Sequence, residues 1–172
     1  MLSQQIQAFQ AGIHRIRARG VDISPDDVIL FRTLVSVGRC LGQFAEQALR
    51  PVSLAEPEFR VLMALFSQPD GAGHPGELCA GSGQSPANMT RITDNLVALK
   101  LITRTPSLQD RRRMLLRVTA QGEALARHFV PAAFKPVHAI FANLSSDARE
   151  QLLSSLQMIA EAFDKHCALA AP

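Results

Sequence analysis

The amino-acid sequence predicts a mainly α-helical protein with one small β-hairpin. Three observations support this fold class. Apolar residues recur at spacings of three and four through most of the chain, which is typical of amphipathic helices. Serine or threonine precedes several of these stretches, twice with proline directly after it, as at helix starts. Two short segments of strand character, 101–105 and 114–118, flank an arginine-rich loop.

Length and composition exclude several classes of protein. With 172 residues and 47% hydrophobic content, the chain can form a core without disulfide or metal support. Its longest uninterrupted apolar run, Val61 to Phe66, is far shorter than the ~20 residues of a membrane span. The polar start lacks a signal-peptide apolar segment, so we expect a cytoplasmic protein with no membrane partner. The absence of Trp and Tyr argues against stacking of single-stranded bases.

The two ends of the chain are predicted to form helices whose apolar faces must dock on another surface. Residues 1–50 form an arm helix, up to about Gly20, and a long first helix that begins at Ser24-Pro25. Residues 121–172 form C-terminal helices, the first capped by Thr119 and kinked at two internal prolines. These helices carry long apolar stripes that one chain alone does not cover. We therefore expect partner helices to bury them.

The central region, 51–120, reads as a winged helix-turn-helix. A helix over 55–67 is followed by a short helix after Pro75, a helix capped by Ser85, and then strand, hairpin and strand. The glycines at 71–76 match G-x-G-x-x-G but follow a helix rather than a strand. We interpret that segment as a flexible turn.

Charge is concentrated in one segment of this region. Residues 91–117 hold seven basic and two acidic side chains, net +5, so the remainder of the +3 chain is net −2. Such an asymmetry favours a local contact with a polyanion. A solvated charged loop is the alternative that remains open. A helix with short polar and arginine side chains suits the major groove, and an arginine on the hairpin suits the minor groove.

Four sequence stretches together resemble the MarR family of bacterial transcription regulators. They are Asn88-Met89-Thr90-Arg91-Ile92, Asp94-Asn95-Leu96, Asp110-Arg111-Arg112, and Val118-Thr119-Ala120-Gln121-Gly122. The similarity extends over about residues 25–165. It implies that residues 1–50 and 121–172 serve dimerisation. Lys100 stands at a turn position that is commonly glycine in the family, so we expect the left-handed conformation at this helix end. The resemblance implies a homodimer rather than an enzyme, with double-stranded DNA as partner. The expected operator is pseudo-palindromic, with half-sites about one helical turn apart.

The resemblance also implies roles for individual residues. The DNA-binding set comprises Ser85, Ala87, Asn88, Thr90 and Arg91 on the reading helix, and Arg111 and Arg112 on the wing. Asn88 and Arg91 are the expected base readers, because Asn pairs with adenine and Arg with guanine. Asp110 is expected to orient one wing arginine by a salt bridge. Arg104, Arg113 and Arg117 are candidates for phosphate contact, with a solvated strand face as the alternative for the last two.

Family members often release DNA when a phenolic or aromatic acid enters a cleft between the helices. We therefore expect no cofactor or bound metal but a small aromatic carboxylate or phenolic effector. The candidate ligand-binding residues are His14, Arg39, Cys40, Phe44, Phe59, Met63 and His128, with ordinary core or dimer packing as the alternative. A redox- or metal-responsive regulator is the second functional hypothesis. Arg15, Arg17 and Arg19 on the arm are an alternative DNA contact.

Overall fold

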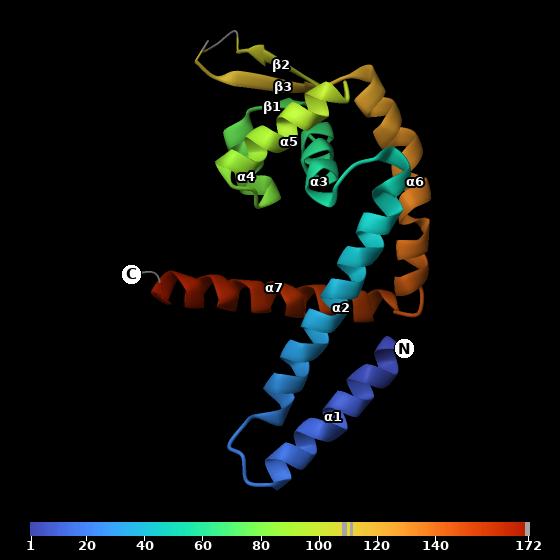
Figure 1. Ribbon diagram of the computed structural model, residues 1–172, viewed down its shortest axis with the longest axis vertical. Coiled ribbons are helices and arrows are strands. Elements are labelled where there is room, and N and C mark those ends of the chain that lie inside the picture. Colours follow the sequence, from blue (N-terminus) through green and yellow to red (C-terminus); the bar gives the residue numbers. More distant parts are fainter. Residues whose placement is uncertain (108–109, 111, 171–172) are drawn as a thin grey trace. The chain divides into compact units, whose positions relative to one another are not determined.

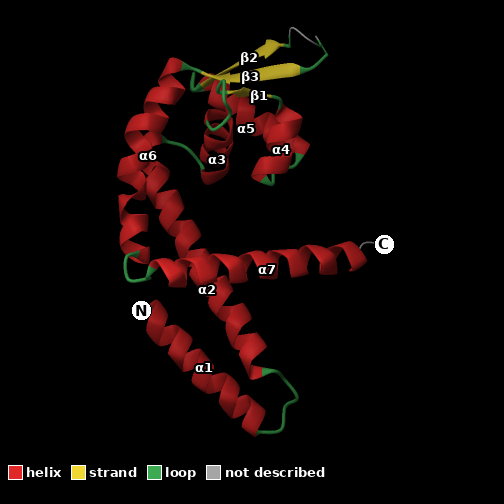
Figure 2. Cartoon of the chain, turned by 180° about the vertical axis from the view of Figure 1, so that it is seen from behind, coloured by secondary structure: helices red, strands yellow, loops and turns green. Residues whose placement is uncertain are grey.

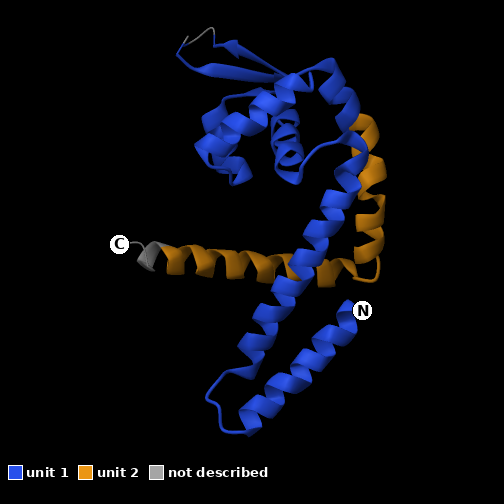
Figure 3. Ribbon diagram, in the orientation of Figure 1, with its two compact units in different colours: residues 1–126 blue, residues 127–172 orange. Residues whose placement is uncertain are grey.

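The structure, a computed structural model, describes residues 1–107, 110 and 112–170. It separates into two compact units, Met1–Ala126 and Arg127–Pro172 (Figure 3). The boundary between these units falls inside a helix. The sequence predicted a different division, at residues 50 and 120, between the dimerisation segments and the winged helix-turn-helix.

The first unit confirms the predicted class, mainly helical with a small antiparallel sheet. Its elements are α1 (Leu2–Ala18), α2 (Pro25–Leu49), the 3-10 turn η1 (Arg50–Val52), α3 (Glu56–Phe66), β1 (Ala72–Gly73), α4 (Pro75–Ser82), α5 (Pro86–Ala98), β2 (Ile102–Pro106), β3 (Met114–Val118) and the start of α6 (Ala120–Phe141). The second unit holds the rest of α6 and α7 (Ser146–Ala170).

Helices α1 and α2 form an antiparallel hairpin, with α1 lying beside the first half of α2 (Figure 1). The predicted start of α2 is confirmed: the Ser24 hydroxyl accepts the Asp27 N–H at 3.5 Å and Pro25 occupies the first turn. Large apolar side chains on α2 stay exposed in the single chain, among them Leu30, Phe31 and Val35. This helix therefore presents an unfilled apolar face beyond its contact with α1.

By length and composition, the segment Pro25–Val52 is one helix that could cross a membrane, with a mean hydropathy of 1.3 in its most apolar window. The count of uninterrupted apolar residues did not detect it, because Arg32 and Arg39 interrupt the stretch. The signal is weak, since core helices of soluble proteins and signal sequences also pass this test. Each arginine at a bilayer centre costs about 2.5–3.5 kcal/mol.

A compact lobe forms where α3, α4 and α5 pack beside the three-stranded sheet (Figure 2). The sheet order is β1-β3-β2, and β2 pairs with β3 in the register Ile102 to Val118 through Pro106 to Met114. Its core consists of side chains with almost no solvent exposure: Leu62, Leu65, Met89, Ile92, Leu96, Ile102 and Leu116. The apolar stripe predicted for α5 is thus its buried face.

The interpretation of residues 71–76 as a flexible turn is wrong. Ala72 and Gly73 form β1 and pair with Arg117 and Leu116 of β3. The turn before them is closed by Gly71, which has φ +58° and accepts the Val118 N–H at 2.9 Å. Two residues are too few to show a periodic sequence pattern. Strand β1 forms because the edge of β3 offers its backbone groups for pairing.

The junction between the sheet and α6 explains the T-x-x-G motif. The Thr119 hydroxyl lies 2.7 Å from the Lys100 carbonyl oxygen and 3.1 Å from that of Leu101, and accepts the Gly122 N–H at 3.0 Å. Gly122 is buried, and a Cβ there would lie 2.2 Å from the Leu101 carbonyl oxygen. Only glycine fits this approach. The expected left-handed conformation of Lys100 is confirmed, with φ 59°.

In the second unit, α6 continues through Pro131 and Pro136, and α7 begins after Ser145. The Ser145 hydroxyl accepts the Ala148 N–H at 3.2 Å, as expected for a helix cap. Helix α7 exposes a run of large apolar side chains: Leu152, Leu153, Leu156, Met158, Ile159 and Phe163. Its stripe is thus not covered by the single chain.

Candidate nucleic-acid interface

The predicted reading helix, α5, presents a polar face to solvent. Its cap is formed by Ser85, whose hydroxyl accepts the Asn88 N–H at 3.3 Å. With the apolar stripe buried, Ala87, Thr90 and Arg91 are exposed together with Ser85. Small side chains at the first turn leave room for a helix to enter a groove about 12 Å wide.

Hydrogen bonds hold the two expected base readers together. The Asn88 side-chain oxygen accepts the Arg91 Nε–H at 3.2 Å and an Arg91 terminal N–H at 3.1 Å. The Asn88 amide nitrogen donates to Gln84 Oε1. The guanidinium is therefore held in one orientation before any ligand arrives. Gln84, in the turn before α5, was not among the predicted residues because a glutamine between glycine and serine carries no motif.

The wing is the β2–β3 hairpin. Asp110 Oδ1 accepts a hydrogen bond from the backbone N–H of Arg112 at 2.9 Å. This bond between a side chain and the backbone two residues further on stabilises the turn. The predicted salt bridge from Asp110 to a wing arginine stays a prediction. Arg112 is exposed, and Arg111 lies outside the described residues.

The three remaining arginines of the basic segment are bonded within the protein. Arg104 lies 2.7 Å from Asp94 and donates to the Thr93 hydroxyl, so it fastens β2 to α5. Arg117 donates to the Asp70 carbonyl oxygen at 2.8 Å. Arg113 pairs with Glu77 of α4 at 3.0 Å. Their role in phosphate contact stays a prediction.

A buried carboxylate on α3 positions the back of α5. Glu58 is 4% exposed; its carboxylate accepts the Ala55 N–H at 2.9 Å and the Asn95 amide at 2.7 Å. This arrangement satisfies a charge that would otherwise be costly to bury. The sequence signal for this contact is a glutamate three residues after the N-terminal cap of the helix. The signal is weak because the cap residue is alanine and not the serine or threonine of a complete capping box.

His74 connects the start of α4 to the wing. Its ring Nδ1 donates to the Met114 carbonyl oxygen at 2.8 Å. Together with the Glu77–Arg113 ion pair, this hydrogen bond joins the first turn of α4 to the start of β3. A single histidine before a helix carries no motif that would signal this contact.

The Arg113 hydrogen bond lowers the pKa of Glu77 below its ordinary 4.5, and the His74 backbone N–H lowers it further. A lowered folded-state pKa stabilises the protein above about pH 4.5, and this contribution is lost as the pH falls through the lowered value. We expect Glu77→Gln to reduce the acid sensitivity of unfolding slightly, measured by urea titration at pH 7 and pH 3.5. Arg113→Gln should do the same. An unchanged pH dependence in both variants would contradict the pairing.

The candidate effector residues lie in several parts of the structure. His14 is exposed on α1; Arg39 is exposed on α2, where Cys40 and Phe44 are half-buried. On α3, Phe59 belongs to the core and Met63 is half-buried. His128 belongs to the second unit. Arg39 lines a pocket between α1 and α2. The effector set therefore stays a prediction.

Cys40, Cys79 and Cys167 are free thiols. Among residues 1–107, 110 and 112–170, no three His, Cys, Asp or Glu side chains gather as a metal site would require. No observation on these residues favours the redox or metal hypothesis over the effector hypothesis.

A short helix, a capped helix with an exposed polar face and a three-stranded sheet ending in a basic hairpin define a winged helix-turn-helix protein. A family model described as MarR family matches residues 52–113. The chain is 25% identical to the HTH-type transcriptional repressor YetL of Bacillus subtilis (strain 168), over 78% of this chain and 81% of YetL. It is 28% identical to the transcriptional repressor MprA of Escherichia coli (strain K12), over 87% and 81%. The chain is therefore similar to MarR family transcription regulators, in its winged helix-turn-helix region by the family model and along most of its length by these two repressors.

Solved structures share the fold. AbsC, a MarR family transcriptional regulator from Streptomyces coelicolor, aligns with a TM-score of 0.77 at 21% identity, over 84% of this chain and 98% of AbsC. Sco3205 from the same organism, solved in complex with DNA, aligns with a TM-score of 0.76 at 16% identity, over 82% and 89%. At these identities the likeness establishes the fold.

Proposed function

We propose that the protein is a cytoplasmic, homodimeric, sequence-specific DNA-binding repressor that a small aromatic carboxylate or phenolic effector releases from its operator. The observation that carries the DNA-binding part is the exposed polar face of α5, with Arg91 held by Asn88, next to a wing that exposes Arg112. Repression is inferred from YetL and MprA, which are both repressors.

Dimerisation is supported by apolar surface on both units. Among residues 146–167 of α7, six large apolar side chains are exposed. Leu152, Leu153 and Leu156, near the start of the helix, line a hollow of about 400 Å³ with Phe141. On the first unit, α2 leaves Phe31 64% exposed. Contiguous apolar patches of this kind mark interfaces on soluble proteins. A two-fold dimer presents two reading helices, so the operator is pseudo-palindromic.

The proposal is tested with the native genomic sites that the protein occupies. We expect two protomers to bind one such site. Affinity should fall on the order of a thousandfold between 50 and 200 mM salt, because several lysine and arginine contacts release counterions. Fluorescence anisotropy with a labelled operator measures the number of protomers bound and the salt dependence of the affinity. A shuffled sequence of equal length is the control. Binding that ignores salt, or that does not distinguish operator from shuffled DNA, would overturn the DNA-reading function.

A further inference from the structure

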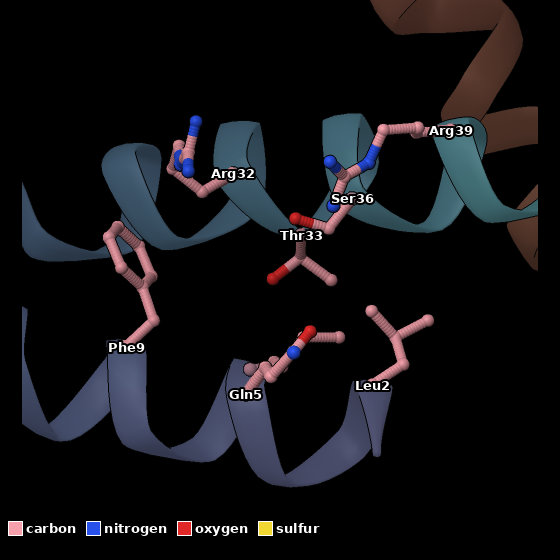
Figure 4. A pocket seen from close by; sticks show the side chains of 8 residues that line it. Leu2, Gln5, Phe9, Arg32, Thr33, Ser36 and Arg39 are labelled. Atoms are coloured by element: carbon pink, nitrogen blue, oxygen red, sulfur yellow. The ribbon is translucent and has the colours of Figure 1, made fainter.

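The pocket between α1 and α2 combines an apolar wall with a cationic one. It is a hollow of about 230 Å³, partly open to solvent, that lies along the antiparallel hairpin beside residues 32–39 of α2, where Arg32 and Arg39 are exposed (Figure 4). Leu2 and Phe9 of α1 are half-buried along it, and α2 contributes Arg32 and Arg39. The two arginines are seven residues apart, so they share one face of α2 about two turns from each other.

The positive charge of this pocket is not neutralised by the described residues. Among them no carboxylate lies within 4 Å of either guanidinium, and α1 contains no acidic residue at all. The hydroxyls of Thr33 and Ser36 line the same wall and are half-buried. Two cations with adjacent hydroxyl donors are suited to a carboxylate, which accepts several hydrogen bonds at once.

The α1 wall offers hydrocarbon on Leu2, Ile6 and Phe9, with the Gln5 side chain among them. The Arg32 guanidinium lies 5.6 Å from the centre of the Phe9 ring, which positions this cation over an aromatic face. A volume of about 230 Å³ corresponds to roughly seven or eight waters at about 30 Å³ each. A ligand of one ring or a short chain fits this volume, and a drug-sized molecule does not.

We propose that this pocket binds a small monocarboxylate with a compact apolar body. Its carboxylate pairs with Arg32 and Arg39, and its hydrocarbon part contacts Leu2 and Phe9. The assignment rests on the effector part of the proposed function and gives that effector a location. Of the residues predicted from sequence, it includes Arg39; Arg32, Phe9 and Leu2 were not predicted. A ligand seated there contacts both helices of the hairpin and stabilises their docking.

The test is isothermal titration calorimetry of the full chain with sodium benzoate. We expect saturable binding that Arg32→Gln/Arg39→Gln weakens at least tenfold, because charge-assisted hydrogen bonds are lost. Benzyl alcohol lacks the charge and sodium acetate lacks the apolar body, so both should bind at least tenfold more weakly than benzoate. Arg15→Gln, an exposed arginine of α1 outside the pocket, is the matched control and should leave benzoate affinity unchanged.

Several outcomes would overturn this site. They are absence of benzoate binding, equal affinity in the double variant, and equal affinity for acetate. If the double variant becomes monomeric by light scattering with unchanged benzoate affinity, the arginines are subunit contacts instead. Should it fail to fold, Arg32→Lys and Arg39→Lys keep the charge but lose the bidentate geometry, and intermediate affinities are expected.

Operator binding without benzoate separates this site from the proposed function. A double variant that binds operator normally but resists release by benzoate supports the site. If the unmodified protein binds no operator, the DNA-reading function fails, and calorimetry still decides whether the pocket binds carboxylate.

Discussion

Arg91→Ala is expected to abolish tight operator binding while leaving the dimer and the fold intact. Arg91 is exposed and its guanidinium is oriented by Asn88, so truncation removes the side chain best placed for a guanine edge. One bidentate base contact contributes about 1–3 kcal/mol. A two-fold dimer loses it at both half-sites. Anisotropy with the native operator should therefore register a loss of roughly thirtyfold to about twenty-thousandfold.

A comparison of operator with shuffled DNA shows whether the lost affinity came from a base contact. A base reader discriminates, so Arg91→Ala should distinguish operator from shuffled DNA less well than the unmodified protein does, while Asn88 retains part of the discrimination. Arg112→Ala should also weaken operator binding, through the wing. Arg50→Ala removes an exposed arginine outside the basic segment and should change nothing. Normal operator binding by both Arg91→Ala and Arg112→Ala would show that the reading-helix assignment is wrong.

Gly122→Ala is expected to be the most destabilising single-methyl addition in the winged-helix lobe. The added Cβ would lie 2.2 Å from the Leu101 carbonyl oxygen and 2.9 Å from Val118 Cγ1. The first neighbour is backbone and cannot rotate away. Overpacking costs typically about 1–3 kcal/mol, and this contact belongs at the upper end. We expect Tm to fall by roughly 6–12 °C in a chain of this size.

Gly81→Ala is the matched control. Gly81 lies within α4, and a Cβ there meets nothing within 4 Å. The change should stabilise by about 0.4–1 kcal/mol, by restricting the unfolded chain. Both variants should be unfolded at the same protomer concentration, because a dimer's stability depends on it. A Gly122→Ala protein as stable as its parent would refute the close approach of α6 to Leu101.

Helix starts were predictable because their chemistry is local. Ser24, Ser85, Thr119 and Ser145 each cap the helix expected from the sequence, since a hydroxyl three residues before an orphan N–H needs no distant partner. Strand β1 was missed because its hydrogen bonds come from β3, far along the chain. Tertiary pairing of this kind leaves no periodic pattern.

The residues of the candidate site can be separated in the same way, into those that depend on local sequence and those that depend on tertiary contacts. Exposure of Ser85, Thr90 and Arg91 follows from the buried stripe of one helix, so the sequence could place them. The contacts of Gln84 and Glu58 depend on side chains that meet only in the folded lobe. The pocket beside Arg32 depends on which face of α1 meets α2. Helical periodicity identifies an apolar face but not its neighbour.

The bond between Asn88 and Arg91 has a kinetic consequence for the search along DNA. In the proposed complex, Asn88 can contact adenine with both side-chain atoms only if its oxygen gives up a bond from Arg91, whereas its amide nitrogen keeps a second hydrogen beside the one that it donates to Gln84. On non-cognate DNA no base edge replaces those bonds, so the two side chains stay closed on each other and the protein is held by phosphates alone, free to slide. At a matching site base edges take their place. We therefore expect the internal bonds of Asn88 to be exchanged for base contacts at a matching site and to be retained on non-cognate DNA.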